Sequence, residues 1–122
     1  MQAYQTQAQM FKVLMHPARL AILDVLRDGE ECVCHIEAAL GFRQAYISQQ
    51  LMLLRDAGLV EDRRDGWNIY YRTSNPEIYR VVDAMNELTG QAPGFESKPE
   101  AGDGKKTCPC PKCNPTAEAV KC

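Results

Sequence analysis

The sequence lacks any apolar run that approaches the roughly 20 residues needed to span a bilayer. The stretch from Met10 to Leu14 leans apolar, but Lys12 interrupts it, and the apolar core and cleavage site of a signal peptide are missing. These absences predict a cytoplasmic protein that does not enter a membrane. Positive charge is not in excess either, because the formal net charge is -2. That balance excludes a protein that coats DNA by bulk charge, but it allows a reader with a local basic patch.

Cysteine, in contrast, is plentiful, with six residues in a chain of 122. Thiols stay reduced in the cytoplasm, so six cysteines indicate metal or redox chemistry more than a disulfide framework. A chain of this length with 45% hydrophobic residues can bury one compact core. We therefore expect one folded domain.

The C-terminal part differs in composition from the rest of the chain. Residues 91–122 hold five of the seven prolines, three of the eight glycines and four of the six cysteines. Such a segment buries too little apolar surface to offset the entropy lost on ordering. The sequence therefore predicts a folded domain at residues 1–90 and a flexible Cys/Pro-rich tail at residues 91–122.

Two helices joined by a short turn with glycine are predicted in the middle of the domain. A helix that starts at Pro17 precedes them, with glycine at its end. A short helix at 33–40 then leads through a turn at 41–43 into a longer helix at 44–57. Helix, turn and helix in this order are typical of DNA-binding domains, although they are also a common packing unit.

The longer helix has two distinct faces. Ile47, Leu51 and Leu54 recur at positions i, i+4 and i+7, so they must face the core. The opposite face carries amide and hydroxyl groups, which are suited to reading base edges. Its outward residues are Gln44, Ser48, Gln49, Met52 and Arg55.

A β-hairpin is predicted after these helices. Strands at 59–64 and 67–72 flank Asp65 and Gly66, a pair that accepts the positive backbone angles of a two-residue turn. Side chains alternate along the second strand, so one face should pack inward while the other meets solvent or phosphate. The expected inward face is Trp67, Ile69 and Tyr71, and the expected outward face is Asn68, Tyr70 and Arg72.

A last helix, expected to open at Pro76, has a continuous apolar stripe. Such a stripe in so small a domain needs another apolar surface to cover it. We expect the first helix of the chain and the same helix of a second subunit to supply that surface. The sequence thus predicts a homodimer. The stripe consists of Ile78, Val81, Val82, Met85 and Leu88.

Three segments together carry a family resemblance. Residues 31–36 read ECVCHI, residues 44–60 read QAYISQQLMLLRDAGLV, and residues 66–72 read GWNIYYR. In this order the chain resembles the ArsR/SmtB family of metal-sensing repressors over residues 10–90. The resemblance implies a mainly α fold with a β-hairpin wing (α+β), which is a homodimeric winged helix-turn-helix. It also implies that the protein binds a two-fold symmetric operator in double-stranded DNA and releases it when an inducer binds.

By position, the resemblance makes the helix at 44–57 the recognition helix and residues 63–72 the wing. Enzymatic activity is not expected, because Cys110 and Cys113 lack the strand-helix-strand surroundings of a thioredoxin-like site. The residues expected to bind DNA are Arg43, Gln44, Tyr46, Ser48, Gln49, Gln50, Arg63, Arg64, Tyr70 and Arg72.

The chain departs from the family pattern at three places. Gln50 stands where members often carry histidine, so the base preference of the helix is open. Glu37 stands where some arsenic sensors have a third cysteine, so the segment at 31–36 alone cannot build a three-thiolate site. The last helix has no histidine, which argues against the zinc site that other members build across the dimer.

Cys32 and Cys34 are the first candidate ligands. At a spacing of i and i+2 they point to different faces of an intact helix, so they can share one ion only at or before its first turn. The positive end of a helix dipole lowers the pKa of a thiol, which makes it a better metal ligand and a better target for oxidants. The alternative is that both are small buried hydrophobes.

The tail supplies the other candidate ligands. Alternating prolines prevent helix formation and keep these thiols accessible, and soft thiolates suit arsenic(III), cadmium, zinc or copper(I), among which arsenic(III) is favoured. The tail ligands are Cys108, Cys110 and Cys113. The residues leave open whether the tail completes the Cys32 and Cys34 site, in its own or the partner subunit, or forms a separate site.

Three functions are compatible with these features. The favoured one is a repressor that leaves its operator when a thiophilic metal or metalloid ion binds. The first alternative is a repressor of the same fold that senses oxidants by linking two cysteines. The second is a metal-buffering protein in which the tail binds the ion and the domain only dimerises.

Overall fold

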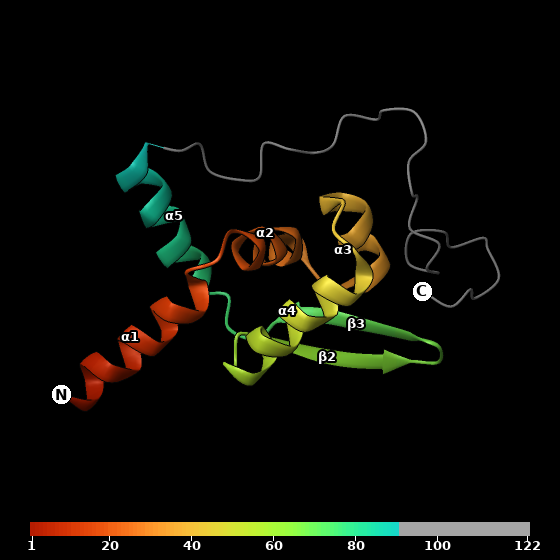
Figure 1. Ribbon diagram of the computed structural model, residues 1–122, viewed down its shortest axis with the longest axis horizontal. Coiled ribbons are helices and arrows are strands. Elements are labelled where there is room, and N and C mark those ends of the chain that lie inside the picture. The colour runs from red at the N-terminus through yellow and green to blue at the C-terminus, as the bar shows by residue number, and fades with distance from the viewer. Residues whose placement is uncertain (91–122) are drawn as a thin grey trace.

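The computed structural model describes residues 1–90 of the protein (Figure 1). The predicted tail and its candidate ligands Cys108, Cys110 and Cys113 lie outside the described residues. No helix in the described part is long and apolar enough to cross a membrane. The elements are, in chain order, α1 (Gln2–Leu14), α2 (Pro17–Val25), the 3-10 helix η1 (Leu26–Asp28), β1 (Glu31–Cys32), α3 (Val33–Leu40), α4 (Gln44–Asp56), β2 (Val60–Asp65), β3 (Asn68–Thr73) and α5 (Ile78–Thr89).

The core lies where α2, α3 and α4 meet. α3 ends at Gly41, which adopts the left-handed conformation with φ 74°, and the chain turns through Arg43 into α4. This confirms the predicted helix-turn-helix. The largest fully buried aliphatic side chains come from all three helices, and each contributes about 1.5–3 kcal/mol by leaving water. They are Ile22, Leu23, Ile36, Ile47, Leu51 and Leu54.

The strands form one three-stranded antiparallel sheet with the order β1-β3-β2. The sequence pattern missed β1, because two residues are too few to show an alternation. Cys32 of β1 pairs with Tyr70 of β3. The β2–β3 hairpin projects to one side of the helices in Figure 1. The chain therefore has a winged helix-turn-helix fold.

The hairpin differs from the prediction in its turn and its faces. Asp65 pairs with Asn68, so Gly66 and Trp67 form the turn, one residue later than expected. Trp67 is not inward but 73% exposed, because it lies at the hairpin tip beyond the reach of the core. Asn68 and Tyr70, expected to face outward, are buried. Tyr70 packs with Cys32, whose strand lies beside it.

α5 is held at its first turns. It begins at Ile78, two residues after Pro76. The Tyr79 hydroxyl donates a hydrogen bond of 2.6 Å to the Leu23 carbonyl and accepts one from Thr73 Oγ1, and burial raises the pKa of this hydroxyl. These bonds join α5 to α2 and to the end of β3.

An ion pair holds α5 further along the helix. The Arg27 guanidinium contacts both carboxylate oxygens of Asp83 at 2.9 and 3.0 Å and lies over the Tyr79 ring, 4.6 Å from its centroid. The hydrogen bond to Asp83 raises the pKa of Arg27, so the guanidinium stays protonated. A bidentate pair of this kind fixes direction as well as distance.

The Tyr79 contacts predict a stability effect that is specific to its hydroxyl. Tyr79→Phe should lower the free energy of unfolding by about 1–2 kcal/mol, because the buried Leu23 carbonyl loses its donor. Urea unfolding followed by circular dichroism measures the change. The control is Tyr4→Phe, which alters a 69% exposed residue and should change the free energy by less than about 0.5 kcal/mol. Equal stability of the two variants would contradict the role given to this hydroxyl.

Candidate functional site

The outer face of α4 is polar, as the sequence predicted. Ile47, Leu51 and Leu54 are fully buried against the core, which sets the rotation of the helix about its own axis. Gln44 and Gln49 are consequently exposed, and Ser48 is half-buried. Arg43, also predicted to contact DNA, is exposed on the same surface and directly precedes the helix.

Two other predicted contact residues on α4 do not lie on this open surface. Gln50 is only 5% exposed, and its Oε1 accepts a hydrogen bond of 2.8 Å from Arg19 Nε on α2. Tyr46 is half-buried, with its ring edge-on to Phe42 at 5.5 Å between centroids. Both side chains are thus engaged with the domain itself.

Two of the three predicted wing arginines are paired with carboxylates. Arg63 binds both carboxylate oxygens of Glu30, with Nε–Oε2 at 3.0 Å, and its pKa is raised by this hydrogen bond. Arg72 pairs with Glu61. Within residues 1–90 no ion pair involves the exposed Arg64. Arg64 is therefore the wing cation whose charge is most available to a phosphate.

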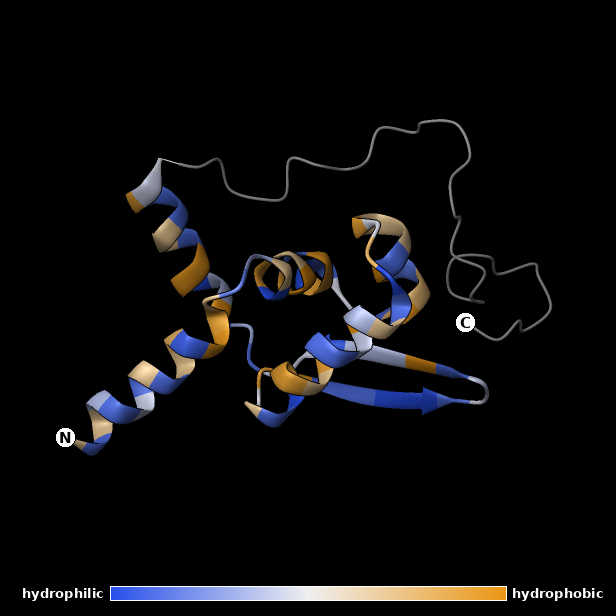
Figure 2. Ribbon diagram, viewed as in Figure 1, coloured by the Kyte–Doolittle hydropathy of each residue, from blue (hydrophilic) through white to orange (hydrophobic). Residues whose placement is uncertain are grey.

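The wing joins the cysteine segment through its strand pairing. Figure 2 shows a largely hydrophilic β2, whose residues from Glu61 to Asp65 are all exposed. The fourth wing residue expected to bind DNA, Tyr70, is buried beside Cys32, and the Arg63 guanidinium lies 4.9 Å from its ring centroid. The wing and the cysteine segment therefore share one small cluster.

Cys32 and Cys34 lie at the start of α3, where the sequence required them to be if they act together. Cys32 is fully buried in an extended conformation before the helix, and the backbone N–H of His35 donates to its Sγ at 3.4 Å. Cys34 is half-buried in the first turn and packs against the cluster of Cys32 and Tyr70. The two cysteines are thus brought into one cluster, in which Cys34 is disulfide-bonded.

The described residues alone do not complete a metal site. Within residues 1–90 no group of three or more His, Cys, Asp or Glu side chains could hold an ion. Arsenic(III) takes three thiolates, and zinc or cadmium usually takes four ligands. Cys32 and Cys34 therefore fit part of such a site, and any further sulfur would have to come from elsewhere.

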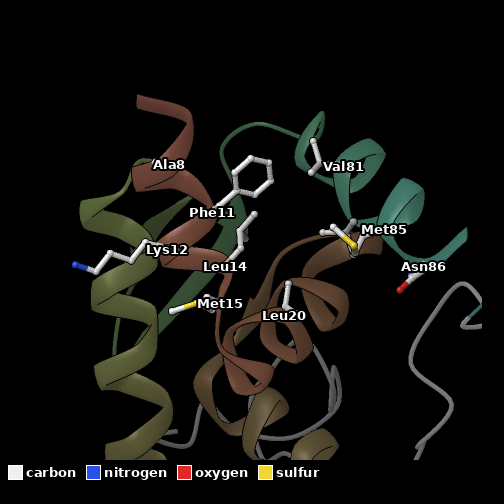
Figure 3. A pocket seen from close by; sticks show the side chains of 10 residues that line it. Ala8, Phe11, Lys12, Leu14, Met15, Leu20, Val81, Met85 and Asn86 are labelled. Carbon is white, nitrogen blue, oxygen red and sulfur yellow. The ribbon is translucent and has the colours of Figure 1, made fainter. Parts of the chain in front are cut away.

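A long apolar groove separates α1 from α5. It has a volume of about 580 Å³. In Figure 3, Phe11 and Leu14 of α1 face Val81 and Met85 of α5, with Leu20 of α2 between them. Phe11 and Met85 are half-exposed, at 54% and 48%. The apolar stripe predicted for the last helix thus remains largely uncovered in the single chain.

Pattern reasoning missed the partners of the functional side chains. The sequence pattern singles out neither Arg19, which binds Gln50, nor Glu30, which binds Arg63. The one local signal was Pro17, because a proline after a helix leaves a carbonyl of that helix without its usual donor.

Sequence comparison places the chain among bacterial regulators. The profile of the bacterial regulatory protein, arsR family, matches residues 16–62. The biofilm growth-associated repressor of Agrobacterium fabrum is 42% identical over 78 residues, which cover 64% of this chain and 67% of that protein. The arsenic resistance transcriptional regulator ArsR1 of Pseudomonas putida is 47% identical over 68 residues, 56% of this chain and 52% of that one.

Solved structures agree with this assignment. The M. tuberculosis protein Rv0081 superimposes with a TM-score of 0.66 at 34% identity, over 72% of this chain and 89% of that one. The homodimeric winged helix-turn-helix DNA-binding domain Mb0332 of Mycobacterium bovis gives a TM-score of 0.64 at 33% identity, over 72% and 82%. The chain belongs to the ArsR/SmtB family and is a transcriptional repressor with a DNA-binding winged helix-turn-helix.

Proposed function

We propose that the protein represses transcription by binding a two-fold symmetric operator through α4 and the wing. The observation that carries this is the polar face of α4, held outward by the burial of Ile47, Leu51 and Leu54. Gln44, Ser48 and Gln49 read base edges in the major groove, while Arg43 and Arg64 bind phosphates. The remaining predicted residues, Tyr46, Gln50, Arg63, Tyr70 and Arg72, are engaged within the domain and act indirectly or after their partners are displaced.

The proposed DNA-binding form is a homodimer built on the apolar groove. A second copy of the same surface would cover Phe11, Val81 and Met85, as a two-fold interface requires. The homodimeric state given for the Mycobacterium bovis domain supports this arrangement. The dimer would place its two recognition helices about 34 Å apart, one turn of DNA. Such a repressor works in the cytoplasm, where its operator lies.

The proposed inducer is a thiophilic metal or metalloid ion, with arsenic(III) favoured over cadmium, zinc and copper(I). Cys32 and, once its disulfide is reduced, Cys34 supply two thiolates at the start of α3, and the tail supplies the rest from Cys108, Cys110 and Cys113. The name of the arsenic resistance regulator in Pseudomonas putida supports this choice. When bound, the ion supplies strong sulfur bonds that draw the thiolates together.

The position of Cys32 explains how an inducer would weaken DNA binding. Cys32 is paired with Tyr70 of β3 and also starts α3, which packs on α4. Glu30, two residues earlier, holds Arg63 on the wing. Movement of Cys32 toward a bound ion would therefore shift both the wing and the helix that supports the recognition helix.

A thiol-redox repressor is the second candidate, and one observation favours it. Cys34 is disulfide-bonded, so its sulfur already takes part in the oxidised form that such a repressor would use. A peroxide would oxidise one thiolate to a sulfenic acid, and a second thiol would displace water to form the disulfide. The metal-buffering alternative gives no role to the polar face of α4.

Base reading by α4 predicts position-specific losses. Ser48→Ala and Gln49→Ala should each weaken operator binding by about 1–3 kcal/mol and relax preference at one base pair. Arg64→Ala is the comparison, because loss of a phosphate contact weakens all sequences alike and lowers the salt slope by about one. Fluorescence anisotropy on the upstream DNA and its single-base-pair variants measures both. Unchanged operator affinity in the Ser48→Ala/Gln49→Ala double variant would remove α4 from this role.

The proposed interface predicts a monomer when charge enters the groove. Met85→Glu should raise the dimer dissociation constant roughly a hundredfold or more, since two unpaired carboxylates would be buried per dimer. Ala84→Glu is the matched control, because it adds the same charge to an exposed position on the same helix outside the groove. Sedimentation velocity reports both states. A wild-type protein that is monomeric at micromolar concentration contradicts the proposal.

The thiol site predicts which changes abolish induction. Cys32→Ser or Cys34→Ser should retain operator binding and lose release by arsenite, and serine at position 32 preserves a helix cap. Deletion of residues 105–122 should weaken the ion's affinity without affecting operator binding. Operator release is titrated with arsenite, cadmium, zinc, copper(I) and peroxide, and X-ray absorption counts the sulfur ligands.

The same titration separates the two inducers. Release by peroxide that a reductant reverses, without release by any of the ions, identifies the redox repressor. A full sulfur shell and normal induction in the tail-deleted protein would show that the tail does not complete the site of Cys32 and Cys34. Retained arsenite release in both serine variants would exclude that site altogether.

A further inference from the structure

One arginine of α2 forms hydrogen bonds to both α1 and α4, the proposed recognition helix. Arg19 of α2 donates from Nε to Gln50 Oε1 of α4 at 2.8 Å and from Nη1 to the carbonyl of Val13 in α1 at 3.0 Å. Arg19 is half-buried, and Gln50 is buried. A single planar guanidinium with two bonds in fixed directions therefore sets where α4 lies relative to the end of α1.

Both acceptors have a physical need for this donor. The Val13 carbonyl is one of the last four of α1, which lack an N–H partner within the helix, and Pro17 four residues later has no N–H to donate. Arg19 takes the place of that donor and also brings positive charge to the negative C-terminal end of the α1 dipole. The Gln50 amide oxygen sits in the buried face of α4, where an unpaired acceptor is costly.

We propose that Gln50 is a positioning residue of the recognition helix and does not read a base. Through Arg19 it fixes α4 to the end of α1, whose Phe11 and Leu14 line the apolar groove. The orientation of each recognition helix is thereby tied to the surface on which two subunits meet. This inference rests on the proposed roles of α4 in DNA reading and of the groove in dimerisation, and it corrects the direct base contact expected for Gln50.

Glutamate at position 50 separates the two roles. In a positioning role, Gln50→Glu keeps an acceptor for Arg19 and adds charge to the bond, so the helix stays in place. In a base-reading role, the same change exchanges an amide suited to adenine for a carboxylate that accepts from cytosine, so the preferred base changes. Gln50→Leu removes the acceptor in either case.

The experiment measures operator affinity and base preference for a set of purified full-length variants. Anisotropy titrations on the upstream DNA and its single-base-pair variants are run for Gln50→Leu, Gln50→Glu, Arg19→Leu and the Arg19→Leu/Gln50→Leu double variant. Gln49→Leu, the exposed neighbour on the same helix, is the matched comparison. Thermal unfolding of every variant records whether the domain folds.

We expect Gln50→Leu to weaken operator binding about tenfold, by an equal factor at every base-pair variant. Arg19→Leu should do the same, and the double variant should be no worse than either single one, because one bond is lost in each. Gln50→Glu should bind within about threefold of wild type with unchanged preference. Gln49→Leu should lose preference at one base pair.

Several results would overturn the inference. A changed base preference in Gln50→Glu would assign Gln50 to base reading. A loss of operator affinity in Gln50→Glu as large as that in Gln50→Leu would show that Gln50 does not act through Arg19. Should Gln50→Leu fail to fold, the Gln50→Glu result alone decides in the same way. If Gln49→Leu and Ser48→Ala leave every base preference unchanged, the proposed reading by α4 fails. If Gln49→Leu and Ser48→Ala do change base preference, an unexpected result for the Gln50 variants contradicts only the positioning role of Gln50.

Discussion

The burial of one face of α4 is the constraint on which the rest of the structure depends. Ile47, Leu51 and Leu54 are all without solvent exposure, and α2 and α3 pack against them. Rotating α4 by a quarter turn would place amides in the core and expose aliphatic side chains at a cost of several kcal/mol. The outward face of α4 is therefore fixed as firmly as the core itself, which is why a short helix can present a stable polar surface.

The wing is attached to this core at the start of β2 and along one edge of β3. Val60 is buried directly after α4, so β2 starts from a fixed point, and β3 pairs on its other edge with β1. The pairing of Cys32 with Tyr70 makes the cysteine segment part of the wing as well as the start of α3. The cysteine segment is thus connected to the wing by strand pairing and to α3 by the chain itself.

The outer helices α1 and α5 are joined to the rest of the domain by polar as well as apolar contacts. Only Ile78 and Tyr79 of α5 are buried, and Arg27 holds the helix through Asp83. α1 contributes Leu14 to the core and is joined to α4 through Arg19. Directional bonds of this kind define an angle between elements, while the exposed apolar faces of α1 and α5 supply the groove. Polar side chains thus set the angles of α1 and α5, while different, apolar side chains form the groove between them.

Patterns with a short period were readable from the sequence by itself. The i, i+4, i+7 spacing of Ile47, Leu51 and Leu54 and the glycine turn before them predicted the helix-turn-helix and the outward polar face, because helical geometry repeats every few residues. The apolar stripe of the last helix likewise predicted an uncovered surface.

Only the tertiary structure decided which polar groups meet. Arg19 and Gln50 are 31 residues apart, and Arg63 and Glu30 are 33 apart, so no local pattern links them. The sequence placed Gln50 among the base readers and Trp67 in the core, yet the fold buries the first and exposes the second. A side chain's partner depends on how whole elements pack. Periodicity determines the face on which a residue lies, but the packing of neighbouring elements determines what that face meets.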